Sequence, residues 1–280
     1  MGLILSLDNS IHSFNRAGFV GLLDEYTGAA AGYSLRRLSV NSTNVIRVRR
    51  SSDNAEADFT ATEITDGTLL SWVGNTASDN GFVTTWYDQA GSNDATQTTA
   101  ASQPKIVDAG VLVEENGRPA VDFDGVDDYL LKVFSLDVTL GYTNFYVCNI
   151  TNSATKYILA SVKNSSNRYA IGINDAGNYQ STKRTAAITH DAATYTSGQV
   201  LLSDNETPEI YLDGVLGSAS VGLLNNAFVS ELLTIGKNSA IAGAQEVSGV
   251  IQEIILYNSD QSSNRVGIET NINNHYNIYT

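Results

Sequence analysis

The sequence predicts an all-β fold, an antiparallel sandwich or jelly roll that ends in one short helix. From residue 121 onward, short runs of β-branched, aromatic and aliphatic residues recur about every 10 to 15 residues, a spacing typical of such sandwiches. Asn, Gly, Asp or Ser stands between most of these runs, as expected for turns. The chain has 280 residues, which is enough to bury a large core without disulfides or metals.

The second half of the chain follows this pattern of apolar runs and turns. Strands are predicted at residues 121–125, 145–150, 157–162, 169–173, 199–202, 209–212, 232–235 and 249–257. The last segment has apolar residues at helical spacing, and Ser262 or Ser263 is its expected N-cap. We therefore expect a C-terminal helix that contains Val266, Ile268 and Ile272.

The first half has a less regular pattern. Strands are predicted at residues 33–38, 44–50, 81–87, 104–107 and 110–113, with a turn at 115–118. A short helix is predicted within residues 62–73, with Thr65 or Asp66 as its cap. We expect residues 1–22 to form an arm for packing or assembly. Residues 23–280 are expected to form a single domain, because no linker divides them.

The composition argues against several classes of partner and compartment. The chain carries 30 acidic against 16 basic residues, so nucleic acid is not expected as a partner. The N-terminus lacks the features of a signal peptide, and no run approaches the ~20 apolar residues of a membrane helix. The single cysteine, Cys148, excludes an intrachain disulfide and is expected to be a buried thiol.

Residues 81–97 form the most distinctive stretch of the sequence. A strand with Trp86 and Tyr87 is followed at once by Asp88, Gln89 and further turn residues. Aromatic rings stack on sugars, while carboxylates and amides bind sugar hydroxyls, so these four residues are candidate carbohydrate contacts. In the alternative interpretation, Trp86 belongs to the core and Asp88 caps its own turn. This interpretation is favoured, because buried Trp and Tyr are common and a single stretch is weak evidence for a binding site.

Motifs in both halves resemble known families. Residues 123–130, 210–214, 235–236 and 249–257 resemble concanavalin A-like (laminin-G-like) sandwiches. Residues 31–38, 47–54, 86–91 and 95–97 resemble the catalytic domain of α-L-arabinofuranosidase B, which is itself such a sandwich. The same combination resembles proteins of tailed bacteriophages. The resemblance implies one concanavalin A-like antiparallel β-sandwich from about residue 33 to the C-terminus.

The resemblance also implies where catalytic carboxylates would lie, because a retaining glycosidase needs two of them. One acid of the family falls on Asn238, whose amide cannot exchange a catalytic proton. The other falls near Asp175, and the family's paired cysteines have no counterpart. We therefore expect no enzymatic activity, and we retain Asp175 and Asn238 as candidate carbohydrate contacts. The alternative is a hydrolase that uses Asp175 with Glu253 or Asp213, although Glu253 is expected to face solvent.

These inferences lead to one preferred function and two alternatives. The preferred function is that of a non-catalytic bacteriophage virion protein, in a tail, a fibre or the head surface, that binds host glycans. Its expected partners are other virion proteins or copies of itself, together with host-surface polysaccharide, and its expected location is the virion or an extracellular surface. The alternatives are an α-L-arabinofuranosidase-like glycoside hydrolase and a bacterial surface lectin or adhesin.

No cofactor is expected, although one acidic run deserves mention as a calcium candidate. Asp122, Asp124, Asp127 and Asp128 lie close together in sequence and could supply the oxygen ligands that calcium prefers. Their spacing lacks the order of a dedicated calcium loop. The sequence therefore favours a solvated acidic turn over a metal site.

Overall fold

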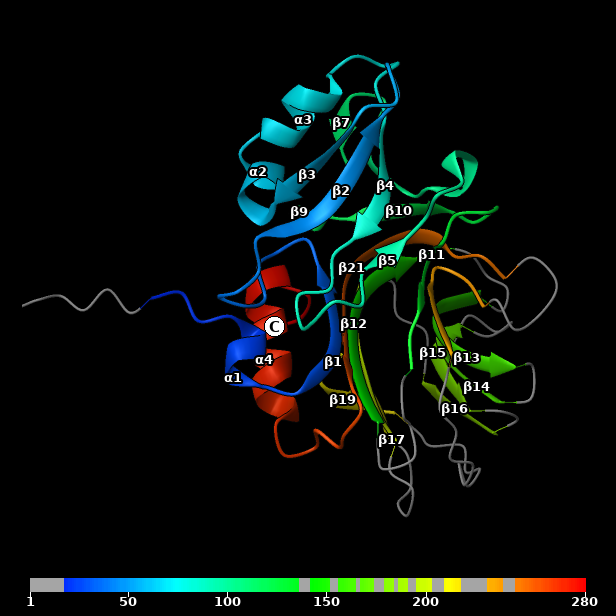
Figure 1. The fold of residues 1–280 in the computed structure, drawn as a ribbon. Helices are drawn as coiled ribbons and strands as arrows, with labels where there is room; N and C mark the ends of the chain where they lie inside the picture. The colour runs from blue at the N-terminus through cyan, green and yellow to red at the C-terminus, as the bar shows by residue number, and fades with distance from the viewer. Residues whose placement is uncertain are drawn as a thin grey trace, which may run out of the picture.

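The computed structural model describes residues 18–135, 142–151, 156–164, 167–173, 179–183, 186–190, 195–202, 209–217, 231–238 and 245–280. It confirms the all-β prediction: a large antiparallel sheet curls over itself and is followed by one C-terminal helix (Figure 1). The pairing of the strands divides this sheet into two layers and a smaller lobe.

The first layer is built around β21, the longest strand among the described residues. β12 pairs with one edge of β21, and β1 and β10 share the other edge. β17, β18 and β19 extend the layer beyond β12. The bounds are β1 Ala29–Ser34, β10 Val121–Asp124, β12 Tyr142–Ile150, β17 Tyr195–Leu202, β18 Glu209–Leu212, β19 Val215–Leu216 and β21 Ser248–Tyr257.

The second layer runs from β5 through β11, β20, β13, β14 and β15 to β16. Figure 1 shows β13–β16 to the right of β12 and β21, with the C-terminal helix on the other side of the first layer. The bounds are β5 Ala95–Thr96, β11 Leu130–Val133, β13 Lys156–Asn164, β14 Asn167–Ile173, β15 Tyr179–Lys183, β16 Ala186–His190 and β20 Leu232–Ile235.

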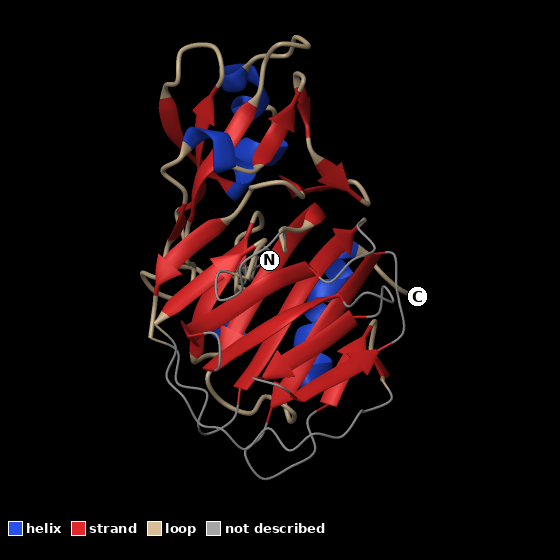
Figure 2. Ribbon diagram, turned by 90° about the vertical axis from the view of Figure 1, so that its right-hand side faces the viewer, coloured by secondary structure: helices blue, strands red, loops and turns tan. Residues whose placement is uncertain are grey.

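The lobe joins both layers, because β6 pairs with β10 and β5 pairs with β4. It lies above the sandwich in Figure 2, and Figure 1 shows its two α-helices on one side of its strands. Its elements are β2 Asn44–Arg50, β3 Glu56–Thr60, α2 Ala61–Thr65, α3 Thr68–Val73, β4 Gly81–Trp86, η1 Ala100–Ser102, β6 Lys105–Asp108, β7 Val111–Leu112, β8 Glu114–Glu115 and β9 Arg118–Pro119.

Both faces of β21 are buried, and all but two of its buried residues after Gly249 are apolar, the exceptions being Gln252 and Glu253. Ile254 and Leu256 belong to a core that lies between the layers and continues into the lobe. Ile255 and Tyr257 point the opposite way and pack on α1 (Leu22–Glu25) and on α4 (Arg265–Tyr276). This alternation follows from the two-residue period of a strand. Cys148 is fully buried in β12, as predicted.

Several helices and strands begin or end at other residues than predicted, because of capping and loop contacts. The predicted helix within residues 62–73 is two helices, because Gly67 with φ 89° interrupts it. The first begins after Thr60, whose side chain forms a capping box with Glu63, and not at Thr65 or Asp66. α4 begins after Asn264, beyond the predicted serine caps. β1 ends at Ser34 and does not extend to residue 38.

The described part of the predicted arm joins the core at its last residues. Residues 1–17 lie outside the described residues. Gly21 is buried, and a Cβ atom on it would lie 2.0 Å from the carbonyl oxygen of Leu38. Leu22 and Leu23 pack in the cluster under α4. Among the described helices, none is long and apolar enough to cross a membrane.

The β8–β9 hairpin caps the end of α4. Its turn residues Asn116 and Gly117 have φ values of 50° and 70°, as a type I′ turn requires. The Asn116 amide donates hydrogen bonds to the carbonyl oxygens of Tyr276 and Asn277, at 2.8 and 2.9 Å. These bonds satisfy carbonyl groups that the helix itself leaves unpaired.

Replacing Asn116 tests this cap. We expect Asn116→Gly to lower the free energy of unfolding by about 1–2 kcal/mol, because it keeps the positive φ but removes both hydrogen bonds. Asn116→Ala should cost more, since alanine is strained at that φ. Urea unfolding measures both. An Asn116→Gly protein as stable as the wild type would show that the amide contributes nothing to the cap.

Candidate functional site

The loop after β4 is held against β1 by the side chain of Asp88. One carboxylate oxygen accepts hydrogen bonds from the backbone nitrogens of Gly32 and Ala90, at 2.8 and 2.9 Å. The other oxygen accepts one from the backbone nitrogen of Asn93 at 3.0 Å. Asp88 is buried, so these bonds replace its lost hydration. Its main role is to shape the loop, as the alternative interpretation proposed.

Gln89 makes a second set of bonds to the same segment. Its side-chain oxygen accepts from the backbone nitrogen of Leu38 at 2.7 Å. Its amide nitrogen donates to the carbonyl oxygens of Ser34 and Arg36, each at 2.9 Å. Gln89 therefore takes the place of a strand partner for residues 34–38, which explains why β1 ends at Ser34. The amide has no remaining role as a primary sugar contact.

Trp86 is fully buried in the core, with its ring 6.2 Å from that of Tyr33. An indole with no exposed face cannot stack on a sugar that arrives from solvent. The candidate role of Trp86 in carbohydrate binding is therefore wrong. The pairing of β4 with β2 shifts register between Val83 and Thr85, and this irregularity lets both Val83 and Trp86 enter the core.

Tyr87 keeps partial exposure and lines the cavity described below. Its hydroxyl donates to a carboxylate oxygen of Asp58 at 2.7 Å. Burial raises the pKa of Tyr87, and the hydrogen bond to Asp58 acts in the same direction. The phenol is therefore neutral at physiological pH, and its ring has a fixed orientation at the end of β4.

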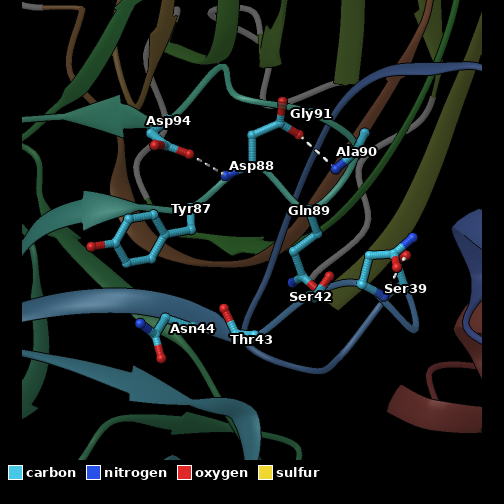
Figure 3. A pocket seen from close by; sticks show the side chains of 11 residues that line it. Ser39, Ser42, Thr43, Asn44, Tyr87, Asp88, Gln89, Ala90, Gly91 and Asp94 are labelled. Atoms are coloured by element: carbon cyan, nitrogen blue, oxygen red, sulfur yellow. Dashed lines mark hydrogen bonds between the residues drawn. The ribbon is translucent and has the colours of Figure 1, made fainter.

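An open cavity of about 410 Å³ lies between this loop and the turn that precedes β2 (Figure 3). Tyr87 and Asn44 lie toward one end of it and Ser39 toward the other. The hydroxyl oxygen of Ser42 is buried and has no hydrogen-bond partner among the described residues. The lining consists of Ser39, Asn41, Ser42, Thr43, Asn44, Tyr87, Asp88, Gln89, Ala90, Gly91 and Asp94.

The cavity offers many hydrogen-bonding groups and few apolar ones. Hydroxyls come from Ser42 and Thr43, and amides from Asn41 and Asn44. Asp94 contributes a carboxylate, one oxygen of which accepts from the backbone nitrogen of Asp88 at 3.0 Å. This set can bind a polyhydroxylated ligand by hydrogen bonds, with the Tyr87 ring as the aromatic surface.

The two remaining candidate contacts are not part of this cavity. Asn238 is 1% exposed and follows the turn after β20, in the second layer. Nearby, the Lys237 ammonium lies 3.6 Å from a carboxylate oxygen of Glu246 and 4.3 Å from the centre of the Tyr129 ring. Asp175 lies outside the described residues. The structure therefore brings Tyr87, Asp88 and Gln89 together and places Asn238 elsewhere.

Glu253 was expected to face solvent, and it is fully buried. Arg36 binds its two oxygens at 2.7 and 2.9 Å, and the Ser34 hydroxyl donates to it at 2.8 Å. Burial alone would raise the pKa of Glu253, but the Arg36 guanidinium holds it below its usual value. The Glu253 carboxylate is therefore held in an ion pair within the fold and does not face solvent. Asp213 lies in the β18–β19 turn, near Glu269 and Tyr279 on the α4 side.

The acidic run forms a tight turn in which Asp124, Asp127 and Asp128 bring one carboxylate oxygen each within 4.8 Å of one another. Asp122 is outside this group. Each of the three carboxylates already accepts a hydrogen bond: Asp124 from two backbone nitrogens, Asp127 from the Ser102 hydroxyl and Asp128 from the Asp124 backbone nitrogen. All three carboxylates are therefore engaged in hydrogen bonds that shape the turn.

Comparison with solved structures supports the fold. The chain is similar to a GH54 α-L-arabinofuranosidase soaked with a cyclic sulfate inhibitor, with a TM-score of 0.70, 14% identity and 90% of this chain covered. An arabinofuranosidase complexed with arabinofuranosyl-α-1,2-xylobiose gives a TM-score of 0.63, also at 14% identity over 90% of this chain. The chain spans 65% and 64% of these two proteins. No family model and no curated protein matches the sequence.

Proposed function

We propose that this chain is a non-catalytic carbohydrate-binding protein whose sugar site is the open cavity between residues 39–44 and the loop after β4. The observation that carries the proposal is the lining of that cavity, in which hydroxyls, amides and a carboxylate surround Tyr87. Sugars are bound in proteins by this combination of polar groups and an aromatic ring. The similarity in fold to arabinofuranosidases supports the proposal.

The rigidity of the cavity wall also supports binding. The side chains of Asp88 and Gln89 make six hydrogen bonds, four to residues 32–38 and two within the loop itself, so the groups that face the cavity are held in place without a ligand. Such preorganisation lowers the entropic cost of binding. Asn44, at the start of β2, and Tyr87, at the end of β4, are positioned by paired strands of the lobe.

The proposal of a non-catalytic role rests on the absence of a suitable pair of carboxylates among the described residues. The amide of Asn238 stands where the resembling family has an acid, and Glu253 is buried in its ion pair with Arg36. We expect no release of nitrophenol from a panel of aryl glycosides that includes the arabinofuranoside. Release that scales with protein concentration and survives further purification would contradict this part.

A glycan array with matched variants tests the binding site. We expect the wild type to bind a subset of neutral glycans, Tyr87→Ala and Asn44→Ala to weaken that binding at least tenfold, and Tyr87→Phe to retain most of it. The reason is that phenylalanine keeps the ring, which stacks on the sugar, and loses only the bond to Asp58. Equal binding by the wild type and Tyr87→Ala, with both folded, would place the sugar elsewhere.

We further propose that this binding serves a bacteriophage particle, in which the protein forms part of a tail, a fibre or the head surface. Its partners would be other virion proteins or copies of itself, and its ligand a host-surface polysaccharide. The resemblance of the sequence motifs to phage proteins supports this setting. Neighbouring genes for capsid or tail proteins are the expected observation, whereas a locus of bacterial surface proteins would favour an adhesin.

A further inference from the structure

A second cavity, of about 290 Å³, lies where the end of α4 meets the β8–β9 hairpin, α2 and the segment after β1. It shares no lining residue with the first cavity. One part of its wall is apolar, from Leu35, Ala61 and Pro119. The complete lining is Leu35, Arg36, Arg37, Ala61, Thr62, Thr65, Arg118, Pro119, His275 and Tyr276.

The charge of this lining is opposite to that of the chain. Three arginines line the cavity and no acidic residue does, although the chain carries a net charge of −14. Arg36 is paired with Glu253 behind the wall. Arg118 and Arg37 have no ion pair with a described carboxylate, although the charge of Arg37 acts on Asp24 and, against the effect of burial, helps to lower the pKa of that carboxyl. No carboxylate among the lining residues balances these two positive charges.

Backbone carbonyl groups hold these two arginines in place. The Nε atom of Arg118 donates to the carbonyl oxygen of His275 at 2.9 Å, in the last turn of α4. Arg37 donates from Nε to the carbonyl oxygen of Ser39 at 2.9 Å, and from a terminal nitrogen to that of Val40. Each guanidinium keeps further N–H groups, which can bind an anion in the bidentate geometry typical of arginine.

His275 adds a neutral polar group beside these charges. Burial and the charges of Arg36 and Arg118, opposed by Glu253, together lower the pKa of His275 to about 4. The imidazole is therefore uncharged at neutral pH and provides one donor and one acceptor. Arg36 and Arg118 line the same cavity as the imidazole, and Arg118 is hydrogen-bonded to the backbone of His275.

We propose that this cavity binds a small organic anion, whose carboxylate or phosphate group pairs with Arg118 and Arg37 while its uncharged part lies against Leu35, Ala61 and Pro119. The volume exceeds what a bare inorganic anion requires, and the apolar wall favours a ligand with a carbon skeleton. This site is independent of the proposed glycan site, because the two cavities have different linings.

Calorimetric titration with three related probes tests the proposal. The probes are glucuronate, glucose 6-phosphate and glucose, which share a ring and differ in charge. We expect one or both anions to bind and glucose not to bind at this cavity, with an affinity that falls as sodium chloride increases. The stronger of the two anions identifies whether carboxylate or phosphate is preferred. Failure of both anions to bind the wild type would overturn the proposal.

Matched charge variants locate the binding. We expect Arg118→Gln to weaken anion binding at least tenfold. Arg37→Gln should have the same effect, and it provides an independent test if the first variant disturbs the β8–β9 hairpin. Arg50→Gln is the control, because it removes the same charge from an ion pair with Asp53 outside the cavity. Equal anion binding by all three folded variants would overturn the proposal. Neutral-glycan binding should persist in Arg118→Gln, so failure of this site and failure of the glycan site are distinguishable.

Discussion

Glu253→Gln is expected to lower the free energy of unfolding by about 3–5 kcal/mol, because it leaves the Arg36 charge unpaired in the core. The side chain of Glu253 is fully buried and that of Arg36 is 14% exposed, so water replaces the lost partner only poorly. The same carboxylate also accepts from the hydroxyls of Ser34 and Tyr276, at 2.8 and 3.2 Å. The substitution therefore weakens the junction of β1, β21 and α4.

A double variant separates the cost of an unpaired charge from the value of the pair. Arg36→Met and Glu253→Leu together remove both charges, and we expect this protein to be more stable than either single variant. Chemical unfolding of the four proteins gives the coupling energy directly. A Glu253→Gln protein within about 1 kcal/mol of the wild type would show that the pair is not essential to the core.

Asp128→Asn is expected to change how stability depends on pH. Burial raises the pKa of Asp128 to about 7, with Asp124, Asp127 and Asp122 acting in the same direction and the hydrogen bond from the Asp124 backbone opposing them. Between about pH 4 and pH 7 the folded protein therefore keeps a proton at Asp128 that the unfolded chain releases. The free energy of unfolding falls as the pH rises through this range and stays low above it.

The size of this effect follows from the same shift. A tenfold change in proton affinity is worth about 1.4 kcal/mol, so complete ionisation of Asp128 costs on the order of 4 kcal/mol. Asparagine is never ionised and can still accept the hydrogen bond from Asp124. We expect the variant to exceed the wild type in stability at pH 8 and to approach it at pH 4. Parallel curves for the two proteins from pH 4 to pH 8 would contradict the account.

The strands were predictable from the sequence where the chain alternates apolar runs with turn residues. β2, β18 and β20 have the predicted bounds, and β21 differs by one residue. β15 and β16 are not predicted, because their sequences of mixed polar and apolar residues lack the alternation of a strand. α2 and α3 are predicted as a single helix, because Gly67 stands in an otherwise periodic segment.

The candidate site was predictable only in part, because its geometry depends on contacts between distant residues. Asp88 and Gln89 were identified as polar residues beside an aromatic pair, but their partners lie more than 50 residues earlier in the chain. The opposite wall of the cavity, residues 39–44, consists mostly of polar turn residues, and no motif in them indicates a binding site. The second cavity combines Arg36, Arg118 and His275 from three separate segments, so no sequence motif predicts it.

The central claim, that the cavity beside Tyr87 binds a sugar, is tested most directly by hydrogen exchange of the backbone amides with and without the strongest array ligand. Bound ligand should slow exchange in residues 39–44 and 87–94 and leave the second cavity, around Arg118 and His275, unchanged. Protection confined to another part of the sandwich, such as the turn around Asn238, would contradict the account.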